Sequence, residues 1–244
     1  MSSIANNLQE VKRRMASACT AAGRKAEILT RAPAAPGLVM GEPSVTLLAV
    51  SKTFPAEAVR EAHAAGQQAF GENYVQEALA KIEALADLRS QLQWHLIGPL
   101  QSNKTRVVAE AFDWVHSVDR LKVAQRLSEQ RPAALPPLQL CLQVNISGEA
   151  SKSGFAPPAV LAAALAVAAM PRLQLRGLMA IPEPAGDFDA QRQAHRALRE
   201  LLAALNAHGL QLDTLSMGMS ADLEAAVAEG ASLVRVGTAI FGRR

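Results

Sequence analysis

Lys52 is the residue whose type and position most directly suggest chemistry. It ends the apolar run Leu47-Leu48-Ala49-Val50-Ser51-Lys52, which is typical of a buried strand. Burial at the end of such a strand can lower the pKa of an amine, and a neutral amine can condense with an aldehyde to form a Schiff base. The alternative is a lysine that extends its amine into water, which is the commoner outcome on position alone.

The loops after the last two expected strands contain residue types that suit a phosphate group. Ser220 precedes a helix expected over residues 221–229 and is a natural N-cap for it. The free amides and the dipole at a helix start favour a dianion. Gly218 lets the backbone approach closely, and Gly237 with Thr238 adds an amide and a hydroxyl. The alternative is an N-cap with a glycine turn and no ligand, which we would favour if Lys52 were absent.

Arg235 is the second unusual residue, because it lies inside an apolar strand expected over residues 233–236. A permanent charge there needs a partner, either a carboxylate on a neighbouring strand or a ring nitrogen of a cofactor. Arginine keeps its proton, so a pyridine nitrogen that accepts from it stays unprotonated and the ring is a weak electron sink. A Schiff-base lysine, a phosphate loop and a ring-nitrogen partner together predict a site for pyridoxal 5′-phosphate (PLP).

Four further residues are candidates for the same site. Asn73 either caps the helix that follows it or contacts the 3-hydroxyl of the PLP ring. His95 lies in an apolar strand, where a hydrogen-bonded core histidine and a cofactor-facing histidine carry equal weight. Met217 ends the strand expected over residues 214–217 and is counted among the cofactor-contacting residues. Lys152, in the loop after the fifth strand, is either a solvated side chain or a second aldehyde acceptor.

The remaining histidines and acidic residues form no recognisable catalytic pattern. His63, His195 and His208 lie on expected helices and are predicted to be exposed. No catalytic triad, carboxylate pair or metal-spaced cluster stands out, so we assign neither catalytic residues nor a metal site.

Short apolar runs alternate with helical patterns along most of the chain. This alternation predicts a parallel sheet, and its eight units predict a (β/α)₈ TIM barrel. An open doubly wound sheet is less well supported, because no GxGxxG follows the first strand. The expected strands cover residues 46–51, 68–71, 93–97, 114–118, 138–145, 174–180, 214–217 and 233–236; the expected helices cover residues 55–65, 75–85, 104–111, 119–129, 158–169, 190–207 and 221–229.

The chain before the first expected strand contributes a helix and a loop. Ile4, Leu8, Val11 and Met15 repeat at three or four residues and predict an amphipathic helix over residues 1–25. No eighth helix is expected after the last strand, so we expect this N-terminal helix to take its place in the outer ring. The Pro- and Gly-rich residues 31–44 are expected to form a surface loop.

Composition indicates a single barrel domain over residues 1–244. The net charge of +3 comes from scattered basic residues without interleaved aromatics, which argues against nucleic acid. The longest apolar stretch, residues 159–170, is too short to span a membrane, and the N-terminus lacks a signal-peptide core. Two distant cysteines indicate no disulfide framework. A cytoplasmic protein is therefore expected.

Many motifs occur in one order from about residue 45 onward. They are LLAVSKT at 47–53, FGENYVQE at 70–77, WHLIGPLQSNK at 94–104, QVNIS at 143–147, KSG at 152–154, RGLMAIP at 176–182, SMGMSAD at 216–222 and VRVGTAIFG at 234–242. These segments resemble the pyridoxal phosphate homeostasis protein family, whose members are similar to the N-terminal barrel of alanine racemase. The resemblance covers nearly the whole chain from that point.

The resemblance implies a PLP barrel of fold type III with Lys52 as the Schiff-base lysine. It also implies phosphate contacts from Ser220, Gly237 and Thr238, with Arg235 near the ring nitrogen. The family is associated with vitamin B6 balance without an established catalytic activity, and its members are described as cytosolic and often monomeric. PLP and, transiently, apo PLP-dependent enzymes are the expected partners.

Two departures from the family pattern concern the surface rather than the cofactor contacts. The loop from about Ala32 to Pro43 is longer than the family's usual link into the first strand, and Phe54 replaces a frequent second lysine.

The alternative function is a PLP-dependent amino-acid racemase. It needs an acid–base group on each face of the substrate, and the single tyrosine, Tyr74, is not an obvious second base.

Overall fold

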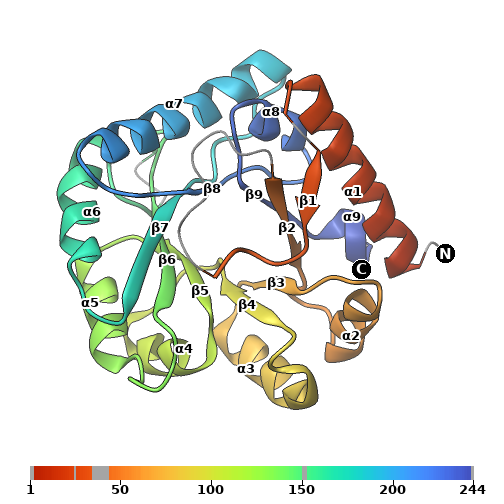
Figure 1. The fold of residues 1–244 in the computed structure, drawn as a ribbon, viewed down its shortest axis with the longest axis horizontal. Helices are drawn as coiled ribbons and strands as arrows, with labels where there is room; N and C mark the ends of the chain where they lie inside the picture. Colours follow the sequence, from red (N-terminus) through yellow and green to blue (C-terminus); the bar gives the residue numbers. More distant parts are fainter. Residues whose placement is uncertain (1–2, 25, 35–43, 150–152, 243–244) are drawn as a thin grey trace.

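The computed structural model describes residues 3–24, 26–34, 44–149 and 153–242. The sheet formed by these residues has nine parallel strands whose spatial order follows the chain, and β2 also pairs with β9. Strands β2 to β9 therefore close into the predicted eight-unit barrel (Figure 1). The strands are β1 (Glu27–Leu29), β2 (Ser44–Val50), β3 (Ala69–Glu72), β4 (Gln93–Leu96), β5 (Trp114–Val118), β6 (Leu138–Gln143), β7 (Leu173–Met179), β8 (Thr214–Ser216) and β9 (Leu233–Val236).

Helices follow the strands and surround the barrel, and each expected crossover helix is present with slightly shifted ends (Figure 1). They are α1 (Ile4–Ala21), α2 (Ala56–Ala64), α3 (Val75–Ala84), α4 (Thr105–Ala111), α5 (Leu121–Gln130), α6 (Val160–Ala168), α7 (Phe188–Ala207), α8 (Leu223–Ala228) and α9 (Thr238–Phe241), with 3₁₀ turns η1 (Ala86–Leu88), η2 (Ser102–Lys104) and η3 (Pro157–Ala159).

Helix α1 occupies the place in the outer ring that was expected for it, against α2, α8 and α9 (Figure 1). Its buried face carries Leu8, Val11 and Met15, which supports the spacing argument. The expectation that no helix follows the last strand is wrong, because the single turn α9 comes directly after β9. This turn packs Ile240 into the core, and its carbonyl accepts a hydrogen bond from the Asn7 amide of α1 at 2.8 Å.

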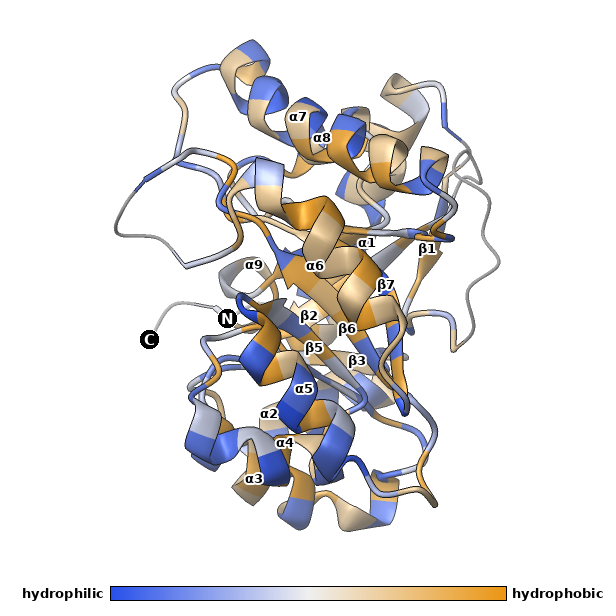
Figure 2. Cartoon of the chain, turned by 90° about the vertical axis from the view of Figure 1, so that its left-hand side faces the viewer, coloured by the Kyte–Doolittle hydropathy of each residue, from blue (hydrophilic) through white to orange (hydrophobic). Residues whose placement is uncertain are grey.

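Apolar residues fill two separate layers. One cluster lies between the outer face of the barrel and the helices, and Figure 2 shows the strands as mainly hydrophobic and the outer helix faces as mixed or hydrophilic. The second cluster joins Ala32 to the strand residues Leu48, Ala69, Trp114, Cys141, Met179 and Leu233. Across the described residues, no helix is long and apolar enough to cross a membrane.

The segment after β1 agrees with the expected surface loop over residues 31–44 at Arg31 and Ala34, which are exposed, and departs from it at Ala32. Ala32 is only 3% exposed, and its backbone N–H donates to Gln93 Oε1 at 2.9 Å. The Pro33 carbonyl accepts from Arg176 Nη1 at 2.7 Å, so the segment reaches from β4 to β7. Ala32 belongs to the interior cluster that also contains Trp114 and Leu233, which accounts for its burial. The part of the expected loop at residues 35–43 lies outside the described residues.

The packing of α1 leads to a stability prediction. Leu8→Ala should lower the free energy of unfolding by about 2–5 kcal/mol, because it removes a fully buried side chain and leaves a cavity. Urea denaturation measures the change, and Gln9→Ala on the exposed face of the same helix is the matched control. Equal stability of the two variants would mean that α1 is not part of the folded core.

Candidate functional site

The expected site residues come from four neighbouring strands of the barrel. Lys52 follows β2, Asn73 follows β3, Ser220 lies in the loop after β8, and Thr238 follows β9. In the sheet these strands lie in the order β8, β9, β2, β3. Because these strands are parallel, their carboxyl ends lie next to one another at the same rim of the barrel. The topology therefore brings together residues that are far apart in the sequence.

Lys52 lies in a tight turn just beyond β2, and it is exposed rather than buried. The strand ends at Val50, so the desolvation suggested by the apolar run does not extend to Lys52. The next residue, Thr53, has a φ of 68°, a left-handed conformation that a β-branched residue rarely adopts. Glu77 holds this turn by accepting the backbone N–H of Thr53. The lysine amine thus projects from a backbone that its neighbours constrain.

A buried ionic cluster lies directly behind that turn and is centred on Lys81, which falls within the helix expected over residues 75–85. Lys81 Nζ donates to the Ser51 carbonyl at 2.7 Å and pairs with Glu72 at 2.8 Å and Glu77 at 2.6 Å. The Ser51 hydroxyl donates to the same Glu72 carboxylate at 2.6 Å. Burial raises the pKa of Glu72, and the neighbouring Lys81 ammonium opposes that shift. The cluster connects the Lys52 turn to β3 and α3.

Arg235 lies beside Leu48 of β2 in the strand register and is 4% exposed. Its Nη1 donates to the Ser216 carbonyl at 2.6 Å and to the Ser216 hydroxyl at 2.8 Å, and its Nη2 donates to the Ala180 carbonyl at 2.9 Å. Burial lowers the pKa of Arg235 to about 10, which leaves it charged at neutral pH. Its Nε has no acceptor within the part of the chain that the structure describes. That donor is therefore available to a ligand.

The loop after β8 is shaped by one glycine and one aspartate. Gly218 has a φ of 88°, and a Cβ there would lie 2.4 Å from the Cβ of Ala226, so only glycine fits. Asp222 accepts the Met219 backbone N–H at 2.7 Å and contacts Nε2 of His195 on α7 at 2.9 Å. Burial raises the pKa of Asp222, but the hydrogen bonds from His195 and from the Met219 amide outweigh it and lower the pKa overall.

Two expectations about this region are wrong. Ser220 is not the N-cap of the following helix, because α8 begins only at Leu223 and Asp222 occupies the N-cap position. Ser220 lies in the preceding turn and is half-buried. His195 is 1% exposed rather than exposed, because it packs under the loop as the partner of Asp222.

The structure places the other candidate residues less uniformly. Asn73 is half-buried at the rim, and it precedes Tyr74, which holds the N-cap position of α3 in its place. His95 is fully buried inside the barrel with protein partners on both ring nitrogens, which favours the core-histidine alternative. The side chain of Met217 belongs to the core cluster between barrel and helices. Lys152 lies outside the described residues.

Sequence reasoning missed two interior residues that contact this site. The Nδ1 of His116 on β5 lies 2.8 Å from Ser216 Oγ on β8, and both residues are buried. The available signal was a polar side chain at an alternate position within an apolar strand, which places it on the inner face. His116 lies two residues after Trp114, an interior residue, and so shares its face.

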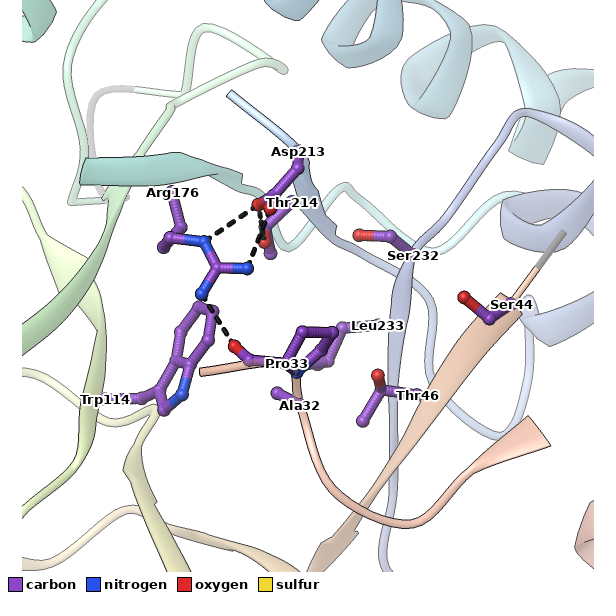
Figure 3. Close-up of a pocket in the computed structure, with 10 residues that line it drawn as sticks. All are labelled: Ala32, Pro33, Ser44, Thr46, Trp114, Arg176, Asp213, Thr214, Ser232 and Leu233. Atoms are coloured by element: carbon purple, nitrogen blue, oxygen red, sulfur yellow. Dashed lines mark hydrogen bonds and ion pairs between the residues drawn. The ribbon is translucent and has the colours of Figure 1, made fainter. Parts of the chain in front are cut away.

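A small cavity lies at the opposite, N-terminal mouth of the barrel (Figure 3). Its lining includes Arg176, whose guanidinium pairs with Asp213 at 2.7 Å and lies 4.9 Å from the centre of the Trp114 ring. Figure 3 shows this arginine between Asp213 and Pro33. Polar residues at this end of a TIM barrel usually serve stability rather than chemistry. The rim at the other end is therefore the candidate site.

Comparison with known proteins agrees with this fold and adds a family. The family model described as "Alanine racemase, N-terminal domain" matches residues 38–244. The pyridoxal phosphate homeostasis protein of Pseudomonas aeruginosa is 62% identical over 244 residues, which cover 100% of this chain and 97% of that protein. The protein of the same name from Escherichia coli K12 is 50% identical, with 100% and 98% covered. The chain belongs to the pyridoxal phosphate homeostasis protein family.

Solved structures of family members and of enzymes share the fold. PipY of Synechococcus elongatus, solved with PLP bound, is 38% identical with a TM-score of 0.78, and the match covers 98% of this chain and 100% of PipY. Alanine racemase of Clostridium difficile is 12% identical with a TM-score of 0.67, covering 82% of this chain and 55% of the enzyme. The second likeness concerns the barrel fold alone.

The buried cluster behind Lys52 leads to a prediction for this family member. Lys81→Met should lower the free energy of unfolding at neutral pH by about 3–5 kcal/mol, because Glu72 would remain buried without its cation. Urea denaturation measures the loss, and Lys122→Met at an exposed position on α5 is the matched control. Glu72→Gln added to Lys81→Met should recover part of the loss by removing the uncompensated charge.

The same variant should show a defined pH dependence. Burial already raises the pKa of Glu72 in the folded protein, so its ionisation costs stability as the pH rises through that pKa. Below the pKa of the unfolded chain the carboxyl is protonated in both states and the cost is absent. Removing Lys81 raises the folded pKa further, so the stability gap to wild type should widen from acidic to neutral pH. A gap independent of pH would contradict this account of the cluster.

Proposed function

We propose that this chain binds PLP as a Schiff base on Lys52 and serves PLP homeostasis by holding and releasing the cofactor with little or no catalysis. The observation that carries the proposal is the pairing of strands β2 and β9. It puts an exposed lysine amine and a buried arginine with an available Nε on neighbouring strands at one rim. The names of the relatives and the PLP-bound structure of PipY support the same cofactor.

The donor groups at the rim fit the chemistry of PLP. An exposed primary amine suits the aldehyde, the condensation forming one C=N bond and releasing one water. Gly237 passes close to the β2 backbone, since a Cβ there would lie 3.2 Å from the Val50 carbonyl oxygen. Thr238 begins α9 with an exposed side chain, so its hydroxyl is accessible to a phosphate. Ser220 supplies a second hydroxyl from the neighbouring loop.

The arginine in this site bears on what the cofactor could do there. PLP supplies an electron sink for carbanion chemistry when its ring nitrogen is protonated. Arg235 stays charged at neutral pH and can only donate, so it would leave that nitrogen unprotonated. This property agrees with a protein that carries PLP rather than one that turns over substrates. Release to apo PLP-dependent enzymes, a monomeric state and a cytoplasmic location remain predictions.

An amino-acid racemase is the second candidate, and the observations give it less support. A two-base racemase needs an acid–base group on each face of its substrate. The single tyrosine of the sequence, Tyr74, is 57% exposed before α3 and is not held against the rim by packing. The alanine racemases share the barrel at low identity, which supports the fold and not the activity.

The Schiff base can be tested by absorbance. Lys52→Ala should lose the imine band that wild-type protein shows after PLP is added, whereas Lys122→Ala, which changes an exposed lysine on α5, should keep it. Borohydride reduction and peptide mass spectrometry then locate the modified lysine. An unchanged band in Lys52→Ala would move the anchor to another lysine, with Lys152 the first to examine. A wild type without any band would exclude the proposed cofactor.

The phosphate contacts can be tested with a matched pair of ligands. Ser220→Ala combined with Thr238→Ala should raise the Kd for PLP by about tenfold or more, because two hydrogen bonds to a charged group are lost. The Kd for pyridoxal, which lacks the phosphate, should change little. Titration followed by absorbance measures both constants. Equal losses for both ligands would mean that these hydroxyls do not contact the phosphate.

A further inference from the structure

A continuous chain of hydrogen bonds crosses the barrel interior from Arg235 to the segment at the N-terminal mouth. Arg235 Nη1 lies 2.8 Å from Ser216 Oγ, and that oxygen lies 2.8 Å from His116 Nδ1. His116 Nε2 lies 2.9 Å from His95 Nδ1, and His95 Nε2 lies 3.0 Å from Gln93 Oε1. All five side chains are buried. This series of hydrogen bonds thus joins β9, β8, β5 and β4 through buried side chains.

The backbone of Ala32 decides the direction of this chain. Its N–H donates to Gln93 Oε1 at 2.9 Å, and its carbonyl accepts from Gln93 Nε2 at 3.1 Å. These two contacts fix which end of the amide faces His95, so the Gln93 oxygen must accept from His95 Nε2. His95 Nδ1 is then an acceptor for the N–H at His116 Nε2. His116 Nδ1 in turn accepts the hydroxyl proton of Ser216.

Both imidazoles are held neutral, as this arrangement requires. Burial lowers the pKa of His116 to about 3, and the positive charge of Arg235 adds to the shift. Burial likewise lowers the pKa of His95, with contributions from His116 and Arg31. The ring of His95 also stacks on Trp114 at 5.3 Å between centres, which fixes its plane. Each neutral ring donates a hydrogen bond from one nitrogen and accepts one at the other. The donors along the network therefore all point the same way, and neither histidine adds a buried charge.

We propose that Gln93, His95, His116 and Ser216 are positioning residues that aim Arg235 at the ring nitrogen of PLP, and that the Ala32 segment sets their direction. The inference rests on the proposed function. Because Ser216 gives its proton to His116, its oxygen remains free to accept from Nη1 of Arg235. In the reversed direction the same oxygen would accept from both His116 and the guanidinium, and the hydroxyl proton of Ser216 would lose its acceptor among the described residues. The observed direction therefore holds Nη1 and leaves Nε for the cofactor.

This arrangement couples the two mouths of the barrel. Ala32 precedes the region matched by the family model, which begins at residue 38. Its contacts with Gln93 lie at the amino end of β4, whereas Arg235 acts near the carboxyl ends of the strands. A change in how the segment packs would alter the tautomers of His95 and His116, and through them the orientation of Arg235 toward the cofactor ring.

The first test uses the protein without PLP. Nitrogen-15 chemical shifts of the histidine rings at neutral pH report which nitrogen carries the proton. Both His95 and His116 should carry it on Nε2, with Nδ1 unprotonated. A ring protonated on Nδ1, or a doubly protonated ring, would overturn the proposed direction. This result does not depend on cofactor binding or on any variant.

The second test isolates the ring nitrogen. Ser216→Ala and Gln93→Met should each weaken PLP binding by about threefold to tenfold, because the guanidinium loses an oriented contact. They should leave the Kd unchanged for a PLP analogue with carbon in place of the ring nitrogen. Ser128→Ala is the matched control, since Ser128 is a buried serine on α5 whose hydroxyl donates to the Pro171 carbonyl and takes no part in this hydrogen-bond network. Its affinities for both ligands should equal those of wild type.

The outcomes separate this inference from the function on which it rests. Equal losses for PLP and the analogue, in a protein whose wild type binds PLP, would overturn the positioning role and leave the proposed function standing. A wild type that does not bind PLP would overturn both. Thermal unfolding of each variant shows that it is folded, and if Gln93→Met fails to fold, Ser216→Ala decides the question because it removes a single oxygen.

Discussion

A permanently charged guanidinium enclosed in a closed barrel is the constraint on which the interior of this protein depends. An unpaired charge at such depth would cost several kcal/mol. Arg235 meets carbonyl and hydroxyl oxygens at the ends of β7 and β8 rather than a carboxylate on an adjacent strand. The parallel sheet supplies these carbonyls at its carboxyl edge. The charge is therefore kept and oriented without a buried counterion in direct contact.

The hydrogen bond between Arg235 and Ser216 has consequences throughout the barrel interior. Ser216 needs an acceptor for its own proton, and His116 provides one only while it is neutral. His116 in turn needs the acceptor that His95 offers, and so on to the backbone at the N-terminal mouth. Each group is satisfied by the next, which is how buried polar networks avoid the penalty of an unpaired member. The interior is accordingly polar along one path and apolar around it.

The other half of the candidate site is stabilised by different physics. The turn that bears Lys52 is held by paired charges, with Lys81 between two glutamates and Thr53 in a left-handed conformation. This cluster lies outside the barrel interior, on β3 and α3. An exposed amine on a constrained turn can meet a ligand without a large rearrangement, while Arg235 on the neighbouring strand is fixed by its hydrogen bonds. The rim thus combines one exposed side chain with one that is buried and held by hydrogen bonds.

Much of the fold could be read from the sequence because it depends on local patterns. Eight apolar runs separated by helical stretches specify a parallel barrel, and the spacing of Leu8, Val11 and Met15 specifies the face by which α1 joins it. The errors occurred where burial depends on distant partners. Ala32 lies in a Pro- and Gly-rich stretch, yet it is buried at the mouth of the barrel. His195 lies on an amphipathic helix, yet it is buried under the β8 loop, where it contacts Asp222.

The sequence by itself determined the order of the strands and the types of residue at their ends, including Lys52, Arg235 and Thr238. These features follow from periodicity and from motifs that stand within a few residues of one another. Only the tertiary structure decided that Lys81 lies beneath the Lys52 turn, and that His95 and His116 meet inside the barrel. Such contacts join residues from separate strands and helices, so only the packing of these elements against one another creates them. Hydrogen-bond direction depends on that packing and has no counterpart in the linear pattern.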